Sequence, residues 1–313
     1  MKRKVIQIAG STQLISLPRQ WCIQQNIKKG AELEIEEQGS KVIVWAERDP
    51  VKKEVEVDIT PLDRSSIMYI IRALYRAGYT TMTLRFKKQL TPHYRSREEK
   101  RIISVIHEEV NRLSGLEIIE EKENVIVLRG ISEMDAGEFE TILRRVFMLI
   151  LDTYHDLLTG IKNNDKVLIE TIEQKHDTIT KFVSYCLRLL NIKGYKKSEK
   201  ITFLYHIIAS LDKITDVVKY AARRARALSK KMAPPAIVVV DQIYKTLQLY
   251  HEFFYKFDVE KVRRLSEMKE NVKISVVQLS KKIPHDQVII INNLEHSLEI
   301  MLDIVEARIS IEY

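Results

Sequence analysis

The pattern of apolar and polar residues divides the chain into three parts, of which the first covers about residues 1–48. Short runs here alternate between apolar and polar side chains, which is the period of a half-buried β-strand. Gly10 and Gly39 stand at turns between runs, and Pro18 stands where a short helix begins. We therefore expect a β-rich unit with strands over 5–8, 13–17, 32–37 and 41–45 and a helix over 18–25.

The second part, residues 50–132, alternates between strand-like and helix-like patterns. Ser65 or Ser66 is placed to cap its first helix, which Gly78 ends. The order β-α-β-α-β-β predicts a small α+β domain. The strands are expected near 54–59, 81–86, 116–119 and 125–128 and the helices near 65–77 and 96–113, the second opened by a Ser-Arg-Glu-Glu sequence from Ser96 that resembles a capping box.

The third part, residues 137–313, is expected to be helical, because apolar residues recur at three- and four-residue spacing throughout. The pair Pro234-Pro235 marks its middle, with three helices on each side. We therefore expect an internal duplication, with repeats of about 137–232 and 235–313. The helices are expected near 137–162, 165–191, 197–230, 236–256, 259–282 and 286–312.

Composition narrows the class of protein. A chain of 313 residues exceeds what one hydrophobic core usually serves, so several domains are expected. An apolar fraction of 45% argues against intrinsic disorder, and no apolar run is long enough to cross a bilayer, so we expect no membrane insertion. The N-terminus shows no secretory signal pattern, and the two cysteines form no metal or redox motif, which favours a cytoplasmic protein.

Pairs of acidic residues four positions apart recur in the helical part. Residues at this spacing share one helix face, so the two carboxylates converge and destabilise the helix unless a positive group lies between them. Carboxylate oxygens bind hard cations and bridge iron or manganese ions between the helices of a bundle. The alternative is a solvated charged face, which any bundle helix shows. The pairs are Glu173 with Asp177, Asp212 with Asp216, and Glu295 with Glu299.

The six helices, their duplication and these (E/D)xxxD motifs resemble PhoU, a family of phosphate-uptake regulators, over about residues 138–313. The resemblance implies an all-α pair of three-helix bundles, divalent or iron-type metal ions at the motifs, and components of a phosphate ABC transporter as partners. Glu267 and Asn271 depart from the motif, because Asn271 is neutral, so the first repeat is the better candidate for metal. His176 and His296, each within an acidic pair, are candidate nitrogen ligands.

Three short motifs mark the first part of the chain: Arg3-Lys-Val-Ile-Gln-Ile-Ala-Gly-Ser-Thr12, Ser16-Leu-Pro-Arg-Gln-Trp21 and Asn26-Ile-Lys-Lys-Gly30. They resemble the AbrB/MazE/SpoVT family of swapped-hairpin, barrel-like DNA-binding domains, in the form fused to PhoU in archaeal phosphate uptake regulators. A homodimer is implied, and the physics agrees, because a β-unit of this size buries too little apolar surface alone. The candidate DNA-binding residues are Arg3, Lys4 and Arg19, since such side chains neutralise phosphates and arginine also binds guanine.

The formal net charge of +8 lies mostly outside this module, because residues 1–49 carry 8 basic and 6 acidic residues, a net charge of +2. Denser basic runs occupy 85–101 and 219–231, and the second is expected to be a solvated helix end. No nucleotide-binding, metalloprotease or serine-hydrolase motif occurs, so we expect neither an enzyme nor an organic cofactor. The sequence predicts a dimeric, DNA-binding regulator of phosphate uptake. The alternatives are a transporter-associated scaffold that does not bind DNA and a metal-dependent phosphohydrolase.

Overall fold

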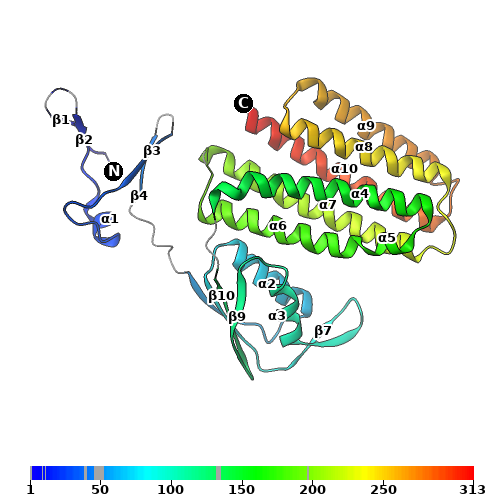
Figure 1. Cartoon of the computed structure of the whole chain (residues 1–313), viewed down its shortest axis with the longest axis horizontal. Coiled ribbons are helices and arrows are strands. Elements are labelled where there is room, and N and C mark those ends of the chain that lie inside the picture. Colours follow the sequence, from blue (N-terminus) through cyan, green and yellow to red (C-terminus); the bar gives the residue numbers. More distant parts are fainter. Residues whose placement is uncertain are drawn as a thin grey trace. The chain divides into compact units, whose positions relative to one another are not determined.

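Contacts in the computed structural model divide the chain into two units, Met1–Lys52 and Lys53–Tyr313. Figure 1 shows the elements of both units in the order of the sequence. The turn expected at Gly39 and the boundary expected between residues 48 and 50 lie outside the residues that the structure describes. The described residues are 2–8, 10, 12–38, 41–45, 53–131, 135–195 and 197–313.

The first unit consists of two antiparallel hairpins and a short helix. β1 (Ile6–Ile8) pairs with β2 (Thr12–Leu14), and β3 (Glu34–Gln38) pairs with β4 (Lys41–Trp45). The helix α1 (Arg19–Gln24) follows Pro18 and is succeeded by Asn26, whose φ of 52° lies in the left-handed region. These strands and this helix confirm the expected elements, although β2 is shorter than its apolar run.

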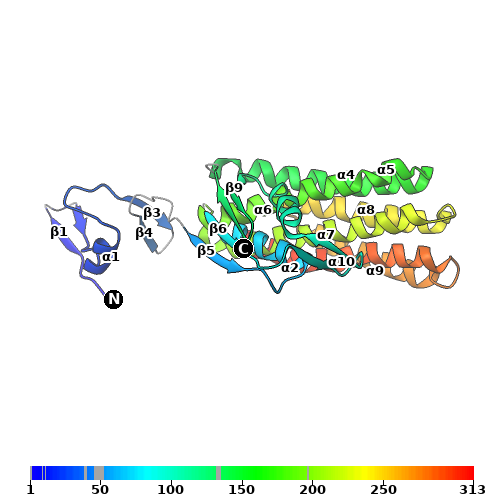
Figure 2. The same ribbon diagram turned by 90° about the horizontal axis from the view of Figure 1, so that it is seen from below.

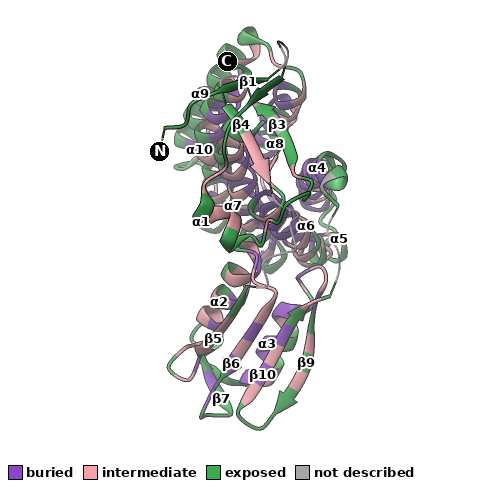
Figure 3. Cartoon of the chain, turned by 90° about the vertical axis from the view of Figure 1, so that its left-hand side faces the viewer, coloured by how far each residue is buried: buried purple, intermediate pink, exposed green. Residues whose placement is uncertain are grey.

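None of the described side chains in the first unit is buried. Figure 3 shows this unit without the purple that marks the cores of the other domains. Many large apolar side chains exposed on one small unit indicate that another surface covers them. The large apolar side chains that are exposed here are Val5, Ile6, Ile8, Leu14, Ile15, Ile23, Ile35 and Val42.

The second unit begins with an α+β domain, a four-stranded sheet covered on one face by two helices (Figures 1 and 3). Its elements are β5 (Glu54–Asp58), α2 (Arg64–Arg76), β6 (Thr81–Arg85), α3 (Ile102–Val110), β9 (Leu116–Lys122) and β10 (Val125–Gly130). The strand order is β5-β6-β10-β9, in which only the β5–β6 pair is parallel, with α2 as its crossover. Alternate residues such as Met82, Leu84, Ile126 and Leu128 are buried in the core.

A hairpin that the sequence pattern does not indicate precedes α3. β7 (Leu90–His93) pairs antiparallel with β8 (Glu98–Arg101). The helix predicted from Ser96 therefore begins only at Ile102, and this prediction was wrong. The four residues of β8 are all charged, so no apolar stripe holds a helix against the core before Ile102. Arg97, with a φ of 56°, closes the hairpin in the left-handed region.

The start of α2 also differs from the prediction. Asp63 is its N-cap, and the carboxylate accepts hydrogen bonds from the backbone N–H groups of Ser65 and Ser66. The two serines therefore lie in the first turn instead of capping it. The predicted end is confirmed, because Gly78 follows the helix with a φ of 91°, a conformation that favours glycine.

The helical domain contains six long helices in its described residues, as the periodicity predicts. The second predicted helix is interrupted at Thr171, whose Oγ1 donates to the carbonyl of Leu168 and competes with helix continuation. None of the helices in the described part of the chain combines the length and the apolar character that a membrane span requires. The helices are α4 (Phe139–Asn163), α5 (Lys166–Glu170), α6 (Ile172–Ile192), α7 (Ile201–Ala227), α8 (Pro234–Tyr255), α9 (Val259–Leu279) and α10 (His285–Glu312).

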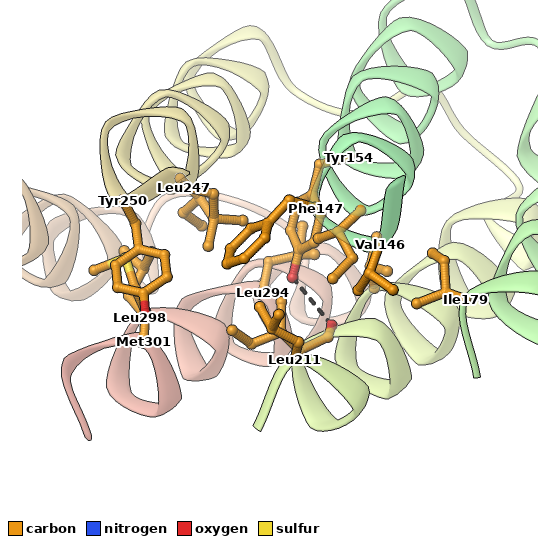
Figure 4. Packing of buried hydrophobic residues seen from close by; sticks show 14 of the residues in the cluster. Val146, Phe147, Tyr154, Ile179, Leu211, Leu247, Tyr250, Leu294, Leu298 and Met301 are labelled. Atoms are coloured by element: carbon orange, nitrogen blue, oxygen red, sulfur yellow. Dashed lines mark hydrogen bonds between the residues drawn. The ribbon is translucent and has the colours of Figure 1, made fainter. Parts of the chain in front are cut away.

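Helices at corresponding places of the two predicted repeats pack against each other. α7 packs most extensively on α10, and α4 packs on α8. In each half a tyrosine of the first helix donates to a carbonyl of the third: Tyr154 to Ile214 at 3.4 Å and Tyr250 to Ile304 at 3.2 Å. Figure 4 shows both tyrosines in the apolar core that the two halves share, with Leu294 of α10 between them.

Candidate functional site

The acidic pairs of the first repeat lie along the seam between α6 and α7. His176 of α6 connects two of the carboxylates, because its Nδ1 lies 3.0 Å from Asp177 Oδ1 and its Nε2 lies 3.0 Å from Asp216 Oδ1. Thr180 of α6 donates from its Oγ1 to Asp212 Oδ1 at 3.1 Å. The structure therefore brings three of the predicted site residues together at one helix–helix contact.

Two arginines of the α+β domain reach these carboxylates. Arg76 in the last turn of α2 places its Nη2 2.8 Å from Asp212 Oδ2, and the same guanidinium donates to Ser184 Oγ at 3.0 Å. Arg112, just after α3, places its Nη2 3.1 Å from Asp177 Oδ2. The acidic face of α6 and α7 is thus the face on which the α+β domain lies.

Two further cations come from α7 itself. Lys219 Nζ lies 2.6 Å from Asp216 Oδ1 and 2.8 Å from His176 Nε2. Arg223 donates from its Nε to Glu173 Oε2 at 2.9 Å and pairs with the other carboxylate oxygen through its Nη2. All four acids of the first repeat therefore have a basic partner.

The end of α6 fixes the α+β domain on this face. Arg188 donates from its Nη1 to the carbonyl of Tyr75 at 2.5 Å, and its guanidinium lies 4.7 Å from the centre of the Tyr75 ring. Asn191 donates from its Nδ2 to the carbonyl of Arg76 at 2.6 Å. These carbonyls belong to the last turn of α2, where a cation and an amide donor are favourable. The Tyr75 carbonyl also accepts from the backbone N–H of Gly78 at 3.0 Å. Figures 1 and 2 show α2 beside α6.

Burial and neighbouring charges shift the pKa values of the ionisable side chains between α6 and α7. Burial opposes ionisation of Asp216, but hydrogen bonds from His176 and Lys219 outweigh it and hold the pKa of Asp216 well below its ordinary value. Burial also lowers the pKa of His176, yet the hydrogen bonds to Asp177 and Asp216 raise it above its ordinary value. The pKa of Lys219 is lowered, chiefly by burial. Two acids and two bases therefore share one partly buried network.

The acids of the second repeat are arranged differently. Lys269, buried on α9, places its Nζ 3.1 Å from Glu299 Oε1. Burial and the charge of Glu299 raise the pKa of Glu295. Glu267 pairs at 3.0 Å with Arg263 on its own helix, where both side chains are exposed. A lysine therefore lies beside the carboxylates at the contact between α9 and α10.

Metal binding requires that these oxygens can accept a cation. In the first repeat the positive charge that a metal would supply comes from arginine and lysine, so a metal would have to displace them. In the stretches of chain that the structure describes, no group of three or more His, Cys, Asp or Glu side chains is arranged to hold a metal ion. The donor set in this arrangement does not fit a carboxylate-bridged cluster. Metal binding at the six predicted residues stays a prediction from the sequence.

Sequence reasoning missed the basic half of this site. Lys219 and Arg223 belong to the run expected to be a solvated helix end, but Lys219 is only 8% exposed, and that expectation was wrong for both residues. The signal was present, because Asp212, Asp216, Lys219 and Arg223 follow one another at spacings of four, three and four residues. These spacings place all four on one helix face.

The predicted DNA-binding residues lie apart from this site in the sequence and belong to the first unit. Arg3 and Lys4 lie a few residues before β1, which begins at Ile6, and Arg19 opens α1. All three side chains are exposed, so each is free to meet a phosphate. Their role in DNA binding stays a prediction.

No family model, no curated protein and no solved structure matches the chain. The function proposed for it therefore rests on its own residues, on the motifs quoted from its sequence and on the contacts of its structure.

Proposed function

We propose that the protein is a cytoplasmic, homodimeric, DNA-binding regulator of phosphate uptake. The first units of two copies interleave as a swapped-hairpin domain and bind DNA. The helical domain, as a PhoU-like pair of three-helix bundles, responds to phosphate status and contacts components of a phosphate transporter. The α+β domain connects the two. No catalytic step is part of this function.

The observation that carries this proposal is the apolar surface of the first unit. Ile6, Ile8, Leu14, Ile35 and Val42 lie on its four strands, and each is between 45% and 66% exposed. A β-unit of this size has no room for a core of its own. A second copy supplies the same apolar strands, so pairing two copies buries both sets. This self-complementarity supports a two-fold homodimer.

A two-fold dimer also explains how a weakly basic unit can bind DNA. Arg3, Lys4 and Arg19 then occur twice, related by the dimer axis, and match a DNA site with two half-sites. Each copy neutralises its own set of phosphates, so the number of phosphate contacts doubles although neither unit carries a large net charge. The affinity is then strongly dependent on salt.

The seam between the α+β and helical domains supports the linking role. Arg76 and Arg112 of the α+β domain pair with Asp212 and Asp177 of the helical domain. A movement of α6 against α7 would change both ion pairs at once, because the two carboxylates lie on different helices of that seam. The proposed signal from the helical domain therefore reaches the α+β domain through charged contacts.

Sedimentation velocity of the full-length protein tests the dimer. We expect the wild type to sediment as a dimer at micromolar concentration and Ile6→Lys to sediment as a monomer, because the substitution places a charge in the apolar surface. Val277→Lys, which changes an exposed apolar residue of α9, is the matched control and stays dimeric. A monomeric wild type would contradict the proposal.

Filter binding to a random double-stranded DNA pool tests the DNA-binding role. The wild type retains DNA at about 50 mM salt and loses affinity steeply towards about 200 mM. Substitution of Arg3 and Arg19 by alanine weakens binding, whereas Lys29→Ala, at an exposed lysine of the same unit, changes it little. If no DNA is retained at the lower salt concentration, the transporter-associated scaffold replaces the DNA-binding role.

A further inference from the structure

The β7–β8 hairpin carries a large share of the positive charge of the chain. Residues 87–101 contain six basic and two acidic residues, so their formal net charge of +4 is half of the +8 of the whole chain. Residues 1–49, in which the candidate DNA-binding residues lie, contribute only +2. A segment with this concentration of positive charge attracts polyanions.

Most of the cations of the hairpin have no acidic partner. Lys100 pairs with Glu98 of the same strand at 3.3 Å. Lys87 lies near Asp58, whose pKa is lowered by hydrogen bonds from Thr60 and also by the charge of Lys87. In the part of the chain that the structure describes, the remaining cations form no ion pair and no side-chain hydrogen bond, and all of them are exposed. They are Lys88, Arg95, Arg97 and Arg101. Their charge is therefore available to a partner from outside.

The hairpin is held in place before any partner binds. It forms a two-stranded sheet of its own, and Figure 1 shows it extending from the α+β domain past α3. The buried side chain of Thr91 donates to the carbonyl of Leu62 at 2.7 Å and so fixes β7 to the domain. In the turn, Ser96 Oγ lies 2.7 Å from His93 Nδ1. A binding surface that is already ordered loses little entropy when a partner binds.

The unpaired cations occupy the two ends of the hairpin. Lys88 and Arg101 lie at its base, and Arg95 and Arg97 lie in its turn. A strand rises about 3.4 Å per residue, so the four residues of β7 separate the two ends by about 10 Å. The major groove of B-DNA is about 12 Å wide. The two ends therefore match the two phosphate backbones that border this groove, and the two glutamates of β8 lie between them.

Exposed tyrosines lie beside the basic turn. Tyr94 within the turn is 75% exposed, and Tyr220 of α7 is 47% exposed. Burial and the charge of Asp216 raise the pKa of Tyr220, and the charge of Arg95 opposes this shift, so Arg95 lies close to the hydroxyl of Tyr220. Tyrosine hydroxyls bind phosphate oxygens in protein–DNA contacts. The surface therefore combines cations with neutral donors, whereas a segment that enters a membrane presents Trp, Phe or Leu to it.

We propose that the β7–β8 hairpin binds the phosphate backbone of DNA and adds a second contact to the one made by the first unit. Phosphates carry no sequence information, so this contact raises the affinity and its dependence on salt without selecting a sequence. The proposal rests on the proposed function, because DNA held by the first unit meets the hairpin of the same chain at a high effective concentration.

Filter binding of the full-length protein to random double-stranded DNA, over a salt series from about 50 to 200 mM, tests the contact. The hairpin variant, Arg95→Gln with Arg97→Gln, removes two exposed cations from each copy of a dimer. Each neutralised phosphate contributes about 0.9 to the slope of log K against log salt, so we expect the slope to become shallower by about 2–4 and the Kd to rise at least about tenfold. Lys281→Gln with Lys282→Gln, an exposed pair between α9 and α10, removes the same charge and should change neither.

A parallel measurement separates this contact from the proposed function. If Arg3→Gln with Arg19→Gln weakens binding but the hairpin variant keeps the slope and Kd of wild type, the hairpin contact is overturned and DNA binding by the first unit stands. A wild type that retains no DNA at about 50 mM salt overturns both. Circular dichroism checks folding, and if the hairpin variant does not fold, Lys87→Gln with Lys88→Gln is judged by the same criteria.

Sedimentation with phosphatidylserine vesicles distinguishes DNA from an anionic membrane surface. If wild type binds these vesicles, the hairpin variant does not, and both bind DNA equally, the partner of the hairpin is a membrane and the proposal is overturned. Weaker DNA binding by the hairpin variant, with no difference between the two proteins on vesicles, supports DNA as the partner.

Discussion

Removal of Arg76 is expected to loosen the α+β domain from the helical domain. Its guanidinium pairs with Asp212 and with Ser184, and the two charged side chains are only 18% and 10% exposed. In Arg76→Ala the carboxylate of Asp212 keeps its hydrogen bond from Thr180 but loses its cation. The variant therefore leaves a mostly buried negative charge without the cation that neutralises it.

The expected loss in the free energy of unfolding follows from that burial. Removing one partner of a buried ion pair costs about 3–5 kcal/mol, and exposed pairs contribute about 0–1 kcal/mol. Asp212 retains one hydrogen bond and slight exposure, so we expect Arg76→Ala to lower the free energy of unfolding by about 2–3 kcal/mol. In an Asp212→Asn background the uncompensated charge is absent, and the same substitution should cost about 1 kcal/mol or less.

Urea unfolding of the four proteins of this double-mutant cycle measures the effect. Both tryptophans, Trp21 and Trp45, belong to the first unit, so their fluorescence reports on that unit alone. Circular dichroism at the helix band reports mainly on the second unit, which contains the six long helices found in the described residues. We expect the dichroism transition to shift in Arg76→Ala and the fluorescence transition to stay in place.

The reasoning is refuted if Arg76→Ala costs less than about 0.5 kcal/mol, which is the range of ordinary surface substitutions. It is equally refuted if the cost is the same with Asp212 and with Asn at that position, because the loss would then not come from the carboxylate.

Three further predictions concern the helical domain. The pKa of His176 is raised in the folded state, so its stabilising contribution is complete below its unfolded pKa of about 6.5 and is lost as the pH rises through the folded pKa. The stability of wild type relative to His176→Asn, measured by urea unfolding, should therefore fall as the pH rises beyond about 6.5. A difference in stability that stays constant with pH contradicts this. Elemental analysis of purified protein, with Asp212→Ala as control, tests metal binding, and wild type with no more metal than the control would remove the metal prediction. Leu294→Ala, in the core shared by both repeats, should cost about 2–5 kcal/mol in thermal or urea unfolding, whereas Val277→Ala on the surface should cost less than about 0.5 kcal/mol.

Strong periodicity made most of the fold predictable. The six long helices follow from apolar spacing, and their breaks follow from local signals such as Pro234 and the capping residues Asp165 and Asp258. The β7–β8 hairpin did not follow, because its charged residues have no apolar alternation and resemble a helix start at Ser96. The first unit was predictable in its strands, and its small size already predicted too little buried apolar surface, which the exposure of its described side chains confirms.

The acidic half of the candidate site was predictable, and the basic half was predictable only in part. The pairs at spacing four identified Asp177, Asp212 and Asp216, and the same face of α7 continues to Lys219, three residues after Asp216. Arg76 could not be found in this way, because it meets Asp212 from a separate domain 136 positions away in the sequence. A contact of that kind depends on domain packing, for which a single sequence carries no local signal.

The most direct test of the account is the DNA affinity of the full-length protein with and without inorganic phosphate. Filter binding is measured on a fragment selected from a random pool, at constant ionic strength, with chloride replacing phosphate in the control. The account predicts salt-sensitive binding at about 50 mM salt and a severalfold change in Kd when phosphate is added. Absence of DNA binding at that salt concentration, or a Kd that does not respond to phosphate, would contradict it.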